Sequence, residues 1–332
     1  MKARQSHIEV LRIVAILLIV AMHAIGCVLT TTNEWNRLGL TAVNAIGNMG
    51  VTVFMLISGY FGIRFRWSKL LTLWLIAIFY SFVETTADWL LGAAPSASML
   101  YGVLTPVTSR RWWFLTCYVV IFCLSPVLNK LVEVLSRRQM HFFLGVLIFF
   151  FILSPTLLLH PLTGDAEGKG LANLLTAYLV GQYIARYGFP VWLQRHCGKL
   201  LVGCFLLAFV GSYMAGCIQP SATIVLCKDN NVLMALGALS ALCWTARHPF
   251  SNAAANWLGA FAFPLYLSNR GVLSLVQPYY VGHVNELCIW GYFAAAMAVA
   301  ILAAFVLEGV RRLSLDGLCS RLGCWADRHL PC

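Results

Sequence analysis

Repeated apolar runs of about twenty residues constrain this chain more than any other feature of its sequence. A run of that length can cross a bilayer as a helix, and lipid-embedded backbone must satisfy its hydrogen bonds within the segment. The 332 residues are 60% hydrophobic and only 11% charged, and the alternating pattern of a membrane β-barrel is absent. We therefore expect an all-α fold, a polytopic integral membrane helical bundle.

The apolar runs predict about ten transmembrane helices joined by short connections. The short connections leave no room for a soluble domain, so we expect one membrane domain over residues 1–312 and a short cytoplasmic tail over 313–332. No internal repeat is evident. The expected spans lie near 8–29, 38–60, 70–91, 112–134, 141–159, 171–188, 199–218, 230–245, 257–277 and 287–310.

Basic residues set the expected orientation of the bundle. Most of the 23 lysines and arginines fall at the N-terminus or after even-numbered spans, which places both termini in the cytoplasm. The net charge of +11 is spread over these connections rather than gathered in one patch. We therefore expect the lipid bilayer, and no nucleic acid, as a partner of the chain.

The first apolar run carries two basic residues on one side. Arg12 and His23 are eleven residues apart, which is three helical turns plus about 20° and a rise of roughly 16 Å. Arg12 lies near the cytoplasmic boundary, where it could simply extend toward water or pair with Glu9. Such a stripe nevertheless indicates a surface that faces protein or water.

His23 is the one histidine of eight that lies well inside a predicted span. It could be a hydrogen-bonded packing residue. An imidazole titrates near neutral pH, however, so His23 is also the deep side chain best suited to accept and return a proton. We treat it as the candidate catalytic base.

Several other helices place polar side chains at a similar depth in the outer half of the membrane. Such groups are expensive in lipid and predict the wall of a binding site. Trp113, together with Trp112, could instead belong to an interfacial aromatic belt. The candidate substrate-binding residues are Asn44, Asn48, Trp113, Tyr118, Tyr178 and Arg270.

Glu84 lies deep in the third predicted span. It could orient His23 or contact a sugar hydroxyl, which makes it a second catalytic candidate. Alternatively, it could form a structural pair with Arg270, since a buried arginine demands a partner.

A compact basic cluster follows the second span at Arg64, Arg66 and Lys69. Topology alone explains it, but the same cations could bind a phosphate-bearing cofactor on the cytoplasmic side. The twelve cysteines show no paired spacing, and the tail cysteines Cys319, Cys324 and Cys332 lack histidine partners at zinc-like spacing, so no metal is predicted.

Four stretches resemble acyltransferase family 3, integral-membrane enzymes that acylate cell-surface sugars. The Arg12–His23 spacing resembles the arginine–ten residues–histidine motif of that family. The other three stretches, in the family's order, are GVTVFMLISGYFGIR at 50–64, WWFLTCYVVIFCLSPVLNKL at 112–131 and FAFPLYLSNRGVL at 261–273. In the last stretch the chain departs from the family, because Asn269 stands where a histidine is common.

The resemblance implies a bacterial inner-membrane O-acyltransferase. It would take acyl-CoA, usually acetyl-CoA, from the cytoplasm, with the phosphates near Arg12, Arg64, Arg66 and Lys69. His23 would act as general base on an acceptor hydroxyl, or accept the acyl group transiently. The acceptor would be a cell-surface or lipid-linked glycan.

Two other functions fit the sequence. A transporter or exporter of a polar solute could use His23, Glu84 and Arg270 as a relay. A membrane scaffold that has lost catalysis is the other, because the family histidine is missing at Asn269.

Overall fold

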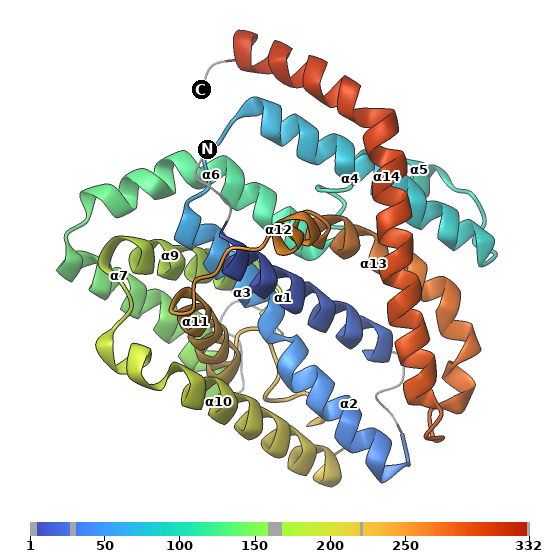
Figure 1. Ribbon diagram of the computed structural model, residues 1–332, viewed down its shortest axis with the longest axis horizontal. Helices are drawn as coiled ribbons and strands as arrows, with labels where there is room; N and C mark the ends of the chain where they lie inside the picture. The colour runs from blue at the N-terminus through green and yellow to red at the C-terminus, as the bar shows by residue number, and fades with distance from the viewer. Residues whose placement is uncertain (1–4, 27–30, 159–167, 220–221, 331–332) are drawn as a thin grey trace.

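A computed structural model describes residues 5–26, 31–158, 168–219 and 222–330, and these residues form helices and contain no strand. The main helices and shorter helical turns are α1 (Ser6–Ile25), α2 (Glu34–Gly47), α3 (Met49–Phe61), α4 (Trp67–Leu90), α5 (Ala97–Leu104), α6 (Trp113–Val134), α7 (Arg137–Ile148), a π-helical turn (Phe149–Leu153), α8 (Ser154–Leu158), α9 (Leu171–Tyr187), α10 (Val191–Ile218), α11 (Val232–Ala246), α12 (Ala253–Gly259), α13 (Ala262–Val276), two 3-10 turns (Gln277–Tyr279, Val281–His283) and α14 (Ile289–His329) (Figure 1).

The all-helical membrane fold is confirmed. Each of the ten predicted spans coincides with helical structure, and seven segments of the described chain are long and apolar enough to cross a membrane. These are Ser6–Ile25, Glu34–Phe61, Trp67–Leu90, Trp113–Val134, Arg137–Leu158, Val191–Ile218 and Ile289–His329. The count of ten crossings and the sides of the termini stay predictions, because α9, α11 and α13 are shorter helices of 17, 15 and 15 residues.

Local sequence explains where several helices begin and end. The side chain of Asn33 accepts hydrogen bonds from the Trp35 and Asn36 amides and so begins α2. Ser136 and Gln139 form a capping box at the start of α7. Gly62, with φ of +72°, lies just beyond the end of α3, a conformation that glycine adopts without strain.

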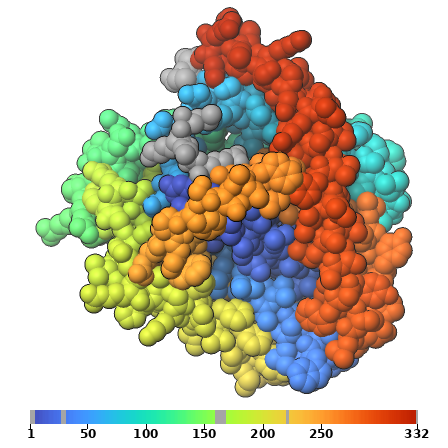
Figure 2. Space-filling view, viewed as in Figure 1, coloured from blue at the N-terminus to red at the C-terminus, as the bar shows by residue number. Residues whose placement is uncertain are grey.

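Helix α1 occupies the centre of the bundle, as Figure 1 shows, and contacts α2, α3, α11, α12, α13 and α14. Its buried residues include Ile16, Ile19 and Val20. In Figure 2 the orange segment around α12 lies across the dark-blue N-terminal part of α1. Hydrogen bonds from the Ser6 hydroxyl to Asn252 and Asn256 hold this crossing.

Helices α3 and α9 cross at very close range through two glycines. A Cβ on Gly59 would lie 2.0 Å from the carbonyl oxygen of Tyr178, and one on Gly181 would lie 2.3 Å from that of Leu56. Small residues allow membrane helices to approach closely enough for backbone-to-backbone contact. The crossing therefore requires glycine on both helices.

The segment expected as a tail, from residue 313 onward, continues helix α14 as far as His329. Helix α14 is 41 residues long, and its far end returns to the start of α4, where the Ser68 amide donates to Asp327 over 2.9 Å. Midway, Glu308 accepts hydrogen bonds from Arg311, Arg312 and Tyr80. These contacts bind α14 to α4 at two levels.

Candidate active site

The stripe predicted on α1 faces two cavities. His23 lines a cavity of about 550 Å³, which we call the His23 cavity. Arg12 lines a second cavity of about 300 Å³, which we call the Arg12 cavity. Ile19, between them on the same side of the helix, lines both. Arg12 and His23 therefore both face cavities beside α1, as their helical spacing predicted.

The two cavities have a common wall. Four residues line both of them: Ile19, Val51, Phe114 and Tyr266. Phe114 and Tyr266 meet edge to face, with ring centroids 5.6 Å apart. Together the cavities follow α1 from Arg12 to His23, one on each side of this apolar wall.

His23 is held by the residue that departs from the family pattern. Its Nδ1 lies 2.7 Å from Oδ1 of Asn269. The Asn269 amide nitrogen donates to the carbonyl oxygens of Leu265 and Tyr266, over 3.2 and 2.5 Å. These two bonds identify which end of the amide is oxygen, so His23 Nδ1 must be the donor.

This hydrogen bond determines the chemistry open to His23. With the proton on Nδ1, neutral imidazole carries its free lone pair on Nε2. His23 is exposed and lines the His23 cavity, whereas Asn269 is buried. The pair therefore presents an oriented proton acceptor to a cavity, as a base and its orienting group do in acyl-transfer enzymes.

The expectation that Glu84 orients His23 or pairs with Arg270 is wrong. Glu84 is buried and accepts from Arg111 Nε over 2.9 Å and from Trp112 Nε1 over 3.2 Å. Gly271 on α13 packs against it. Glu84 thus secures the start of α6 to α4 and α13, and it lines neither cavity.

Trp112 differs from its expected place in an interfacial belt, because it is buried against Glu84. The neighbouring Trp113 lines the His23 cavity. The turn before α6 has Arg110 at φ of +54°, and this turn precedes the Arg111 that reaches Glu84.

The predicted substrate-binding residues separate into three groups. Asn44, Asn48, Trp113 and Arg270 line the His23 cavity, as the shared depth suggested. Tyr118 lies instead in the Arg12 cavity.

Tyr178 was expected in the same wall as Asn44, but it is fully buried elsewhere. Its hydroxyl donates to Asn129 and accepts from the Ile63 amide, beside the end of α3. Tyr178 therefore holds the α3–α4 connection and lines neither cavity.

The predicted cofactor-binding cations lie at one end of the bundle. The Arg12 guanidinium is paired with Glu9 over 2.8 Å and lies 5.8 Å from the Phe61 ring centroid, next to the connection that carries Arg64 and Arg66. Arg64, Arg66 and Lys69 are exposed, and none of them lines the Arg12 cavity. These three exposed cations lie on the α3–α4 connection and in the first turn of α4, and we call them the basic rim.

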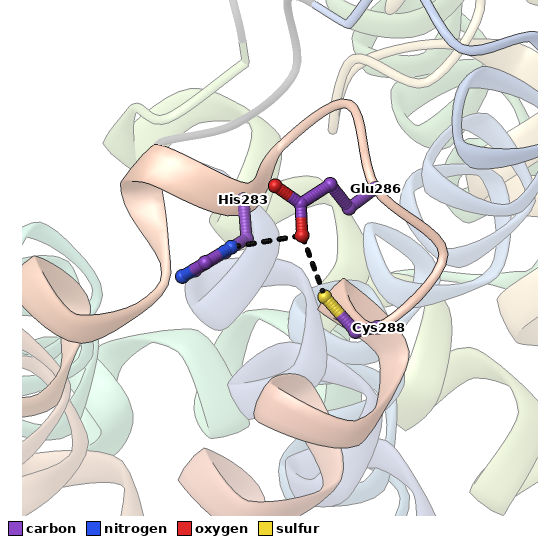
Figure 3. Close-up of side chains that lie close together, drawn as sticks. All are labelled: His283, Glu286 and Cys288. Atoms are coloured by element: carbon purple, nitrogen blue, oxygen red, sulfur yellow. Dashed lines mark hydrogen bonds and ion pairs between the residues drawn. The ribbon is translucent and has the colours of Figure 1, made fainter.

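One group of potential metal ligands lies apart from both cavities, on the connection between α13 and α14 (Figure 3). The carboxylate of Glu286 accepts from Cys288 and lies 3.0 Å from His283 Nδ1. The hydrogen bond to the Glu286 carboxylate raises the pKa of the Cys288 thiol. Cys319 and Cys324 are free thiols on α14, and Cys332 lies outside the described residues.

Replacement of Asn269 by leucine is expected to lower the rate of acyl transfer about 10²-fold, because His23 would lose the acceptor that orients it. The KM for acyl-CoA should remain unchanged. Steady-state kinetics of purified protein in liposomes measures both quantities. Asn269→Asp keeps the acceptor oxygen and should retain more activity than the leucine variant.

Ser268→Ala is the matched control, because Ser268 is buried next to Asn269 but its hydroxyl has no hydrogen-bond partner among the described residues. An equal loss in Ser268→Ala and Asn269→Leu would assign the effect to general disturbance of α13. It would contradict the orienting role.

Comparison with known protein families adds one finding. A family model described as an acyltransferase domain, that of acyltransferase family 3, matches residues 6–309. No curated protein and no solved structure matches the chain. The matched region holds both cavities and the whole Arg12–His23 stripe. The chain therefore belongs to acyltransferase family 3 and is a multi-pass membrane acyltransferase.

Proposed function

We propose that this protein is an O-acetyltransferase of the bacterial inner membrane. It transfers an acetyl group from cytoplasmic acetyl-CoA to a hydroxyl of a cell-surface or lipid-linked glycan, with His23 as general base. The observation that carries the proposal is the His23–Asn269 hydrogen bond, which leaves Nε2 of His23 free on a residue that lines a cavity. Acyltransferases of this family supply the reaction class.

The Arg12 cavity suits the acyl-CoA. Its lining is largely apolar and includes Phe54, Leu73 and Phe263, with Ser58 and Tyr118 as polar groups. A pantetheine arm is long and mostly uncharged, so it fits such a passage. The phosphates would remain outside, near Arg12 and the exposed basic rim of Arg64, Arg66 and Lys69.

The His23 cavity suits the acceptor. It is the larger cavity and carries the amides of Asn44 and Asn48 and the indole of Trp113. Amides bind hydroxyl groups in both directions, as donors and acceptors, and an aromatic face packs against a sugar ring. A saccharide would therefore find both kinds of contact in this cavity.

The reaction needs the two substrates to meet at the common wall. The acceptor oxygen attacks the thioester carbonyl carbon while its proton passes to Nε2 of His23. The C–S bond then breaks, and the proton returns from Nε2 to the departing CoA thiolate. Ile19 and Tyr266, which line both cavities, would have to shift to let the thioester approach His23.

The contacts of Asn269 argue against the alternative that the protein is a membrane scaffold that has lost catalysis. A lost catalytic position has no reason to retain an oriented contact with the remaining base. Here the substituted residue is buried and makes three hydrogen bonds, one of them to His23. This geometry favours a working site in which asparagine takes over the orientation of the base.

The first test is transfer of label from radioactive acetyl-CoA into glycan in membranes that contain the protein. Arg12→Gln is expected to raise the KM for acetyl-CoA about 10- to 100-fold, since a charged hydrogen bond is worth about 1.5–3 kcal/mol. The rate at saturating acetyl-CoA should change less. Initial rates over a range of acetyl-CoA concentrations measure both quantities.

Glu9→Gln is the control for that variant, because it removes the Arg12–Glu9 ion pair but leaves the cation. It should not raise the KM for acetyl-CoA. If the two variants raise KM equally, Arg12 serves the ion pair rather than the cofactor. If wild-type membranes transfer no label, the proposed function itself is wrong.

A further inference from the structure

Three cations line the His23 cavity, and they come from three different parts of the fold. Arg270 lies on α13, Lys169 precedes α9, and Lys228 precedes α11. One acidic residue, Asp229, lies among the cavity-lining residues. Arg270 and Lys228 alone outnumber Asp229, and a cavity for an uncharged sugar does not require this excess of positive charge.

The two lysines are carried by connections that are packed firmly together. Gly168, at φ of +74°, would place a Cβ only 2.3 Å from the Asn230 amide nitrogen, so the two connections meet backbone to backbone. The buried Asn173 side chain donates to the carbonyl oxygens of both Gly168 and Asp229, over 3.0 and 3.1 Å. Lys169 and Lys228 each adjoin one of these tied residues. Their backbone positions are therefore fixed before any ligand arrives.

Arg270 strengthens the case because its charge is not neutralised by an ion pair within the described chain. Glu84, a buried carboxylate within electrostatic range of Arg270, has one oxygen engaged by Arg111 and the other by Trp112. Arg270 is exposed and lines the cavity. An arginine in the middle of a membrane-embedded helix is costly unless it meets water or an anion.

Two of these cations also lie near the proposed base. Both Lys169 and Arg270 lie within electrostatic range of His23. An acceptor with a hydroxyl at His23 Nε2 could therefore have its charged group at Arg270 or Lys228. Arginine in particular binds carboxylate and phosphate groups through paired hydrogen bonds.

We propose that the acceptor is a negatively charged saccharide, and that Arg270 and Lys228 bind its anionic group. The anion is a carboxylate or a phosphate, and it belongs either to the sugar itself or to the lipid carrier of that sugar. The inference rests on the proposed function, since it names the substrate class of the same site. It adds that the site selects its acceptor by charge, which the acyl-transfer reaction itself does not require.

The test supplies purified protein in liposomes with radioactive acetyl-CoA and the saccharide fraction of the host envelope. Labelled product is then separated on an anion-exchange resin. We expect the label to be retained on the resin. Mild acid, which cleaves sugar–phosphate linkages to a lipid carrier, separates the two sources of charge. Label that stays retained indicates an acidic sugar, and label that is released indicates the phosphate of the carrier.

Arg270→Gln and Lys228→Gln make the same test at the level of residues. Each is expected to raise the KM for the acidic acceptor about tenfold or more, with the KM for acetyl-CoA unchanged. Arg110→Gln is the matched control, because Arg110 is exposed and lines neither cavity. Its KM for the acceptor should equal that of wild type.

The outcomes separate this inference from the proposed function. Label in an uncharged product, or no change in acceptor KM in either variant, overturns the anionic acceptor and leaves acyl transfer in place. A raised KM for acetyl-CoA instead would assign the cavity to the donor and also overturn it. Failure of wild type to label any glycan removes the proposed function and this inference together.

Discussion

Exchange of His23 for glutamine is expected to lower acetyl transfer to the glycan about 10²- to 10⁴-fold, the usual contribution of a general base. Glutamine can still donate a hydrogen bond to Asn269, but it cannot take a proton from the acceptor hydroxyl. Acetyl-CoA binding should persist, because Arg12 and its cavity are unchanged. Transfer of radioactive acetyl groups and equilibrium binding of acetyl-CoA, both in liposomes, measure the two effects.

His7→Gln is the control, since His7 lies on the same helix and lines neither the His23 nor the Arg12 cavity. It should transfer acetyl groups at close to the wild-type rate. Retention of most activity in His23→Gln would contradict the assigned role. A transporter would behave differently again, with solute uptake rather than acetyl transfer lost on replacement of His23.

Replacement of Gly59 by alanine is expected to destabilise the folded protein by about 3 kcal/mol or more, at the upper end of overpacking effects. The added Cβ would lie 2.0 Å from the Tyr178 carbonyl oxygen and 2.9 Å from its carbon. These are backbone atoms of a packed helix, so they cannot rotate away as a side chain can. Helices α3 and α9 must therefore separate along their crossing.

Denaturant unfolding in detergent, followed by tryptophan fluorescence, measures this loss. Gly203→Ala in α10 is the matched control, because a Cβ there meets no atom within 4 Å. That change should leave stability unaltered or increase it slightly, since alanine favours helix more than glycine does. Equal stability of the Gly59 and Gly203 variants would show that the α3–α9 crossing is looser than the structure indicates.

The features of the fold that could be predicted are those that follow from apolar runs and from helical spacing along the sequence. The ten apolar segments are largely helical over their described residues, and helical spacing brings the Arg12–His23 stripe to face two cavities. Asn44 and Asn48 reach the expected cavity for the same reason, one turn apart on neighbouring helical segments. The depth of a side chain along its helix and the side of the helix on which it lies both follow from counting residues.

The contacts that could not be predicted depend on how the connecting segments position neighbouring helices. Glu84 meets Arg111 because the turn at Arg110 directs the chain back toward α4. Residue spacing in the sequence does not predict this partner. Tyr178 lies at the expected position in its helix, but α9 packs against the end of α3 rather than around the His23 cavity.

Asn269 shows a different limit. Read along the sequence, it marks only the loss of a histidine that the family commonly has. In the structure it is the partner of His23, since one helical turn of α13 supplies two carbonyl groups that orient its amide. A hydrogen-bonding role of this kind has no periodic signal, and only the packing of α13 on α1 reveals it.

The wall shared by the two cavities has a consequence for the cell as well as for catalysis. Two cavities separated by a thin wall inside a membrane protein would conduct protons if water joined them in one continuous column. Ile19, Val51, Phe114 and Tyr266 interrupt that column with aliphatic and aromatic side chains. Under the proposed function, the same four residues that admit the thioester therefore also insulate the membrane between turnovers.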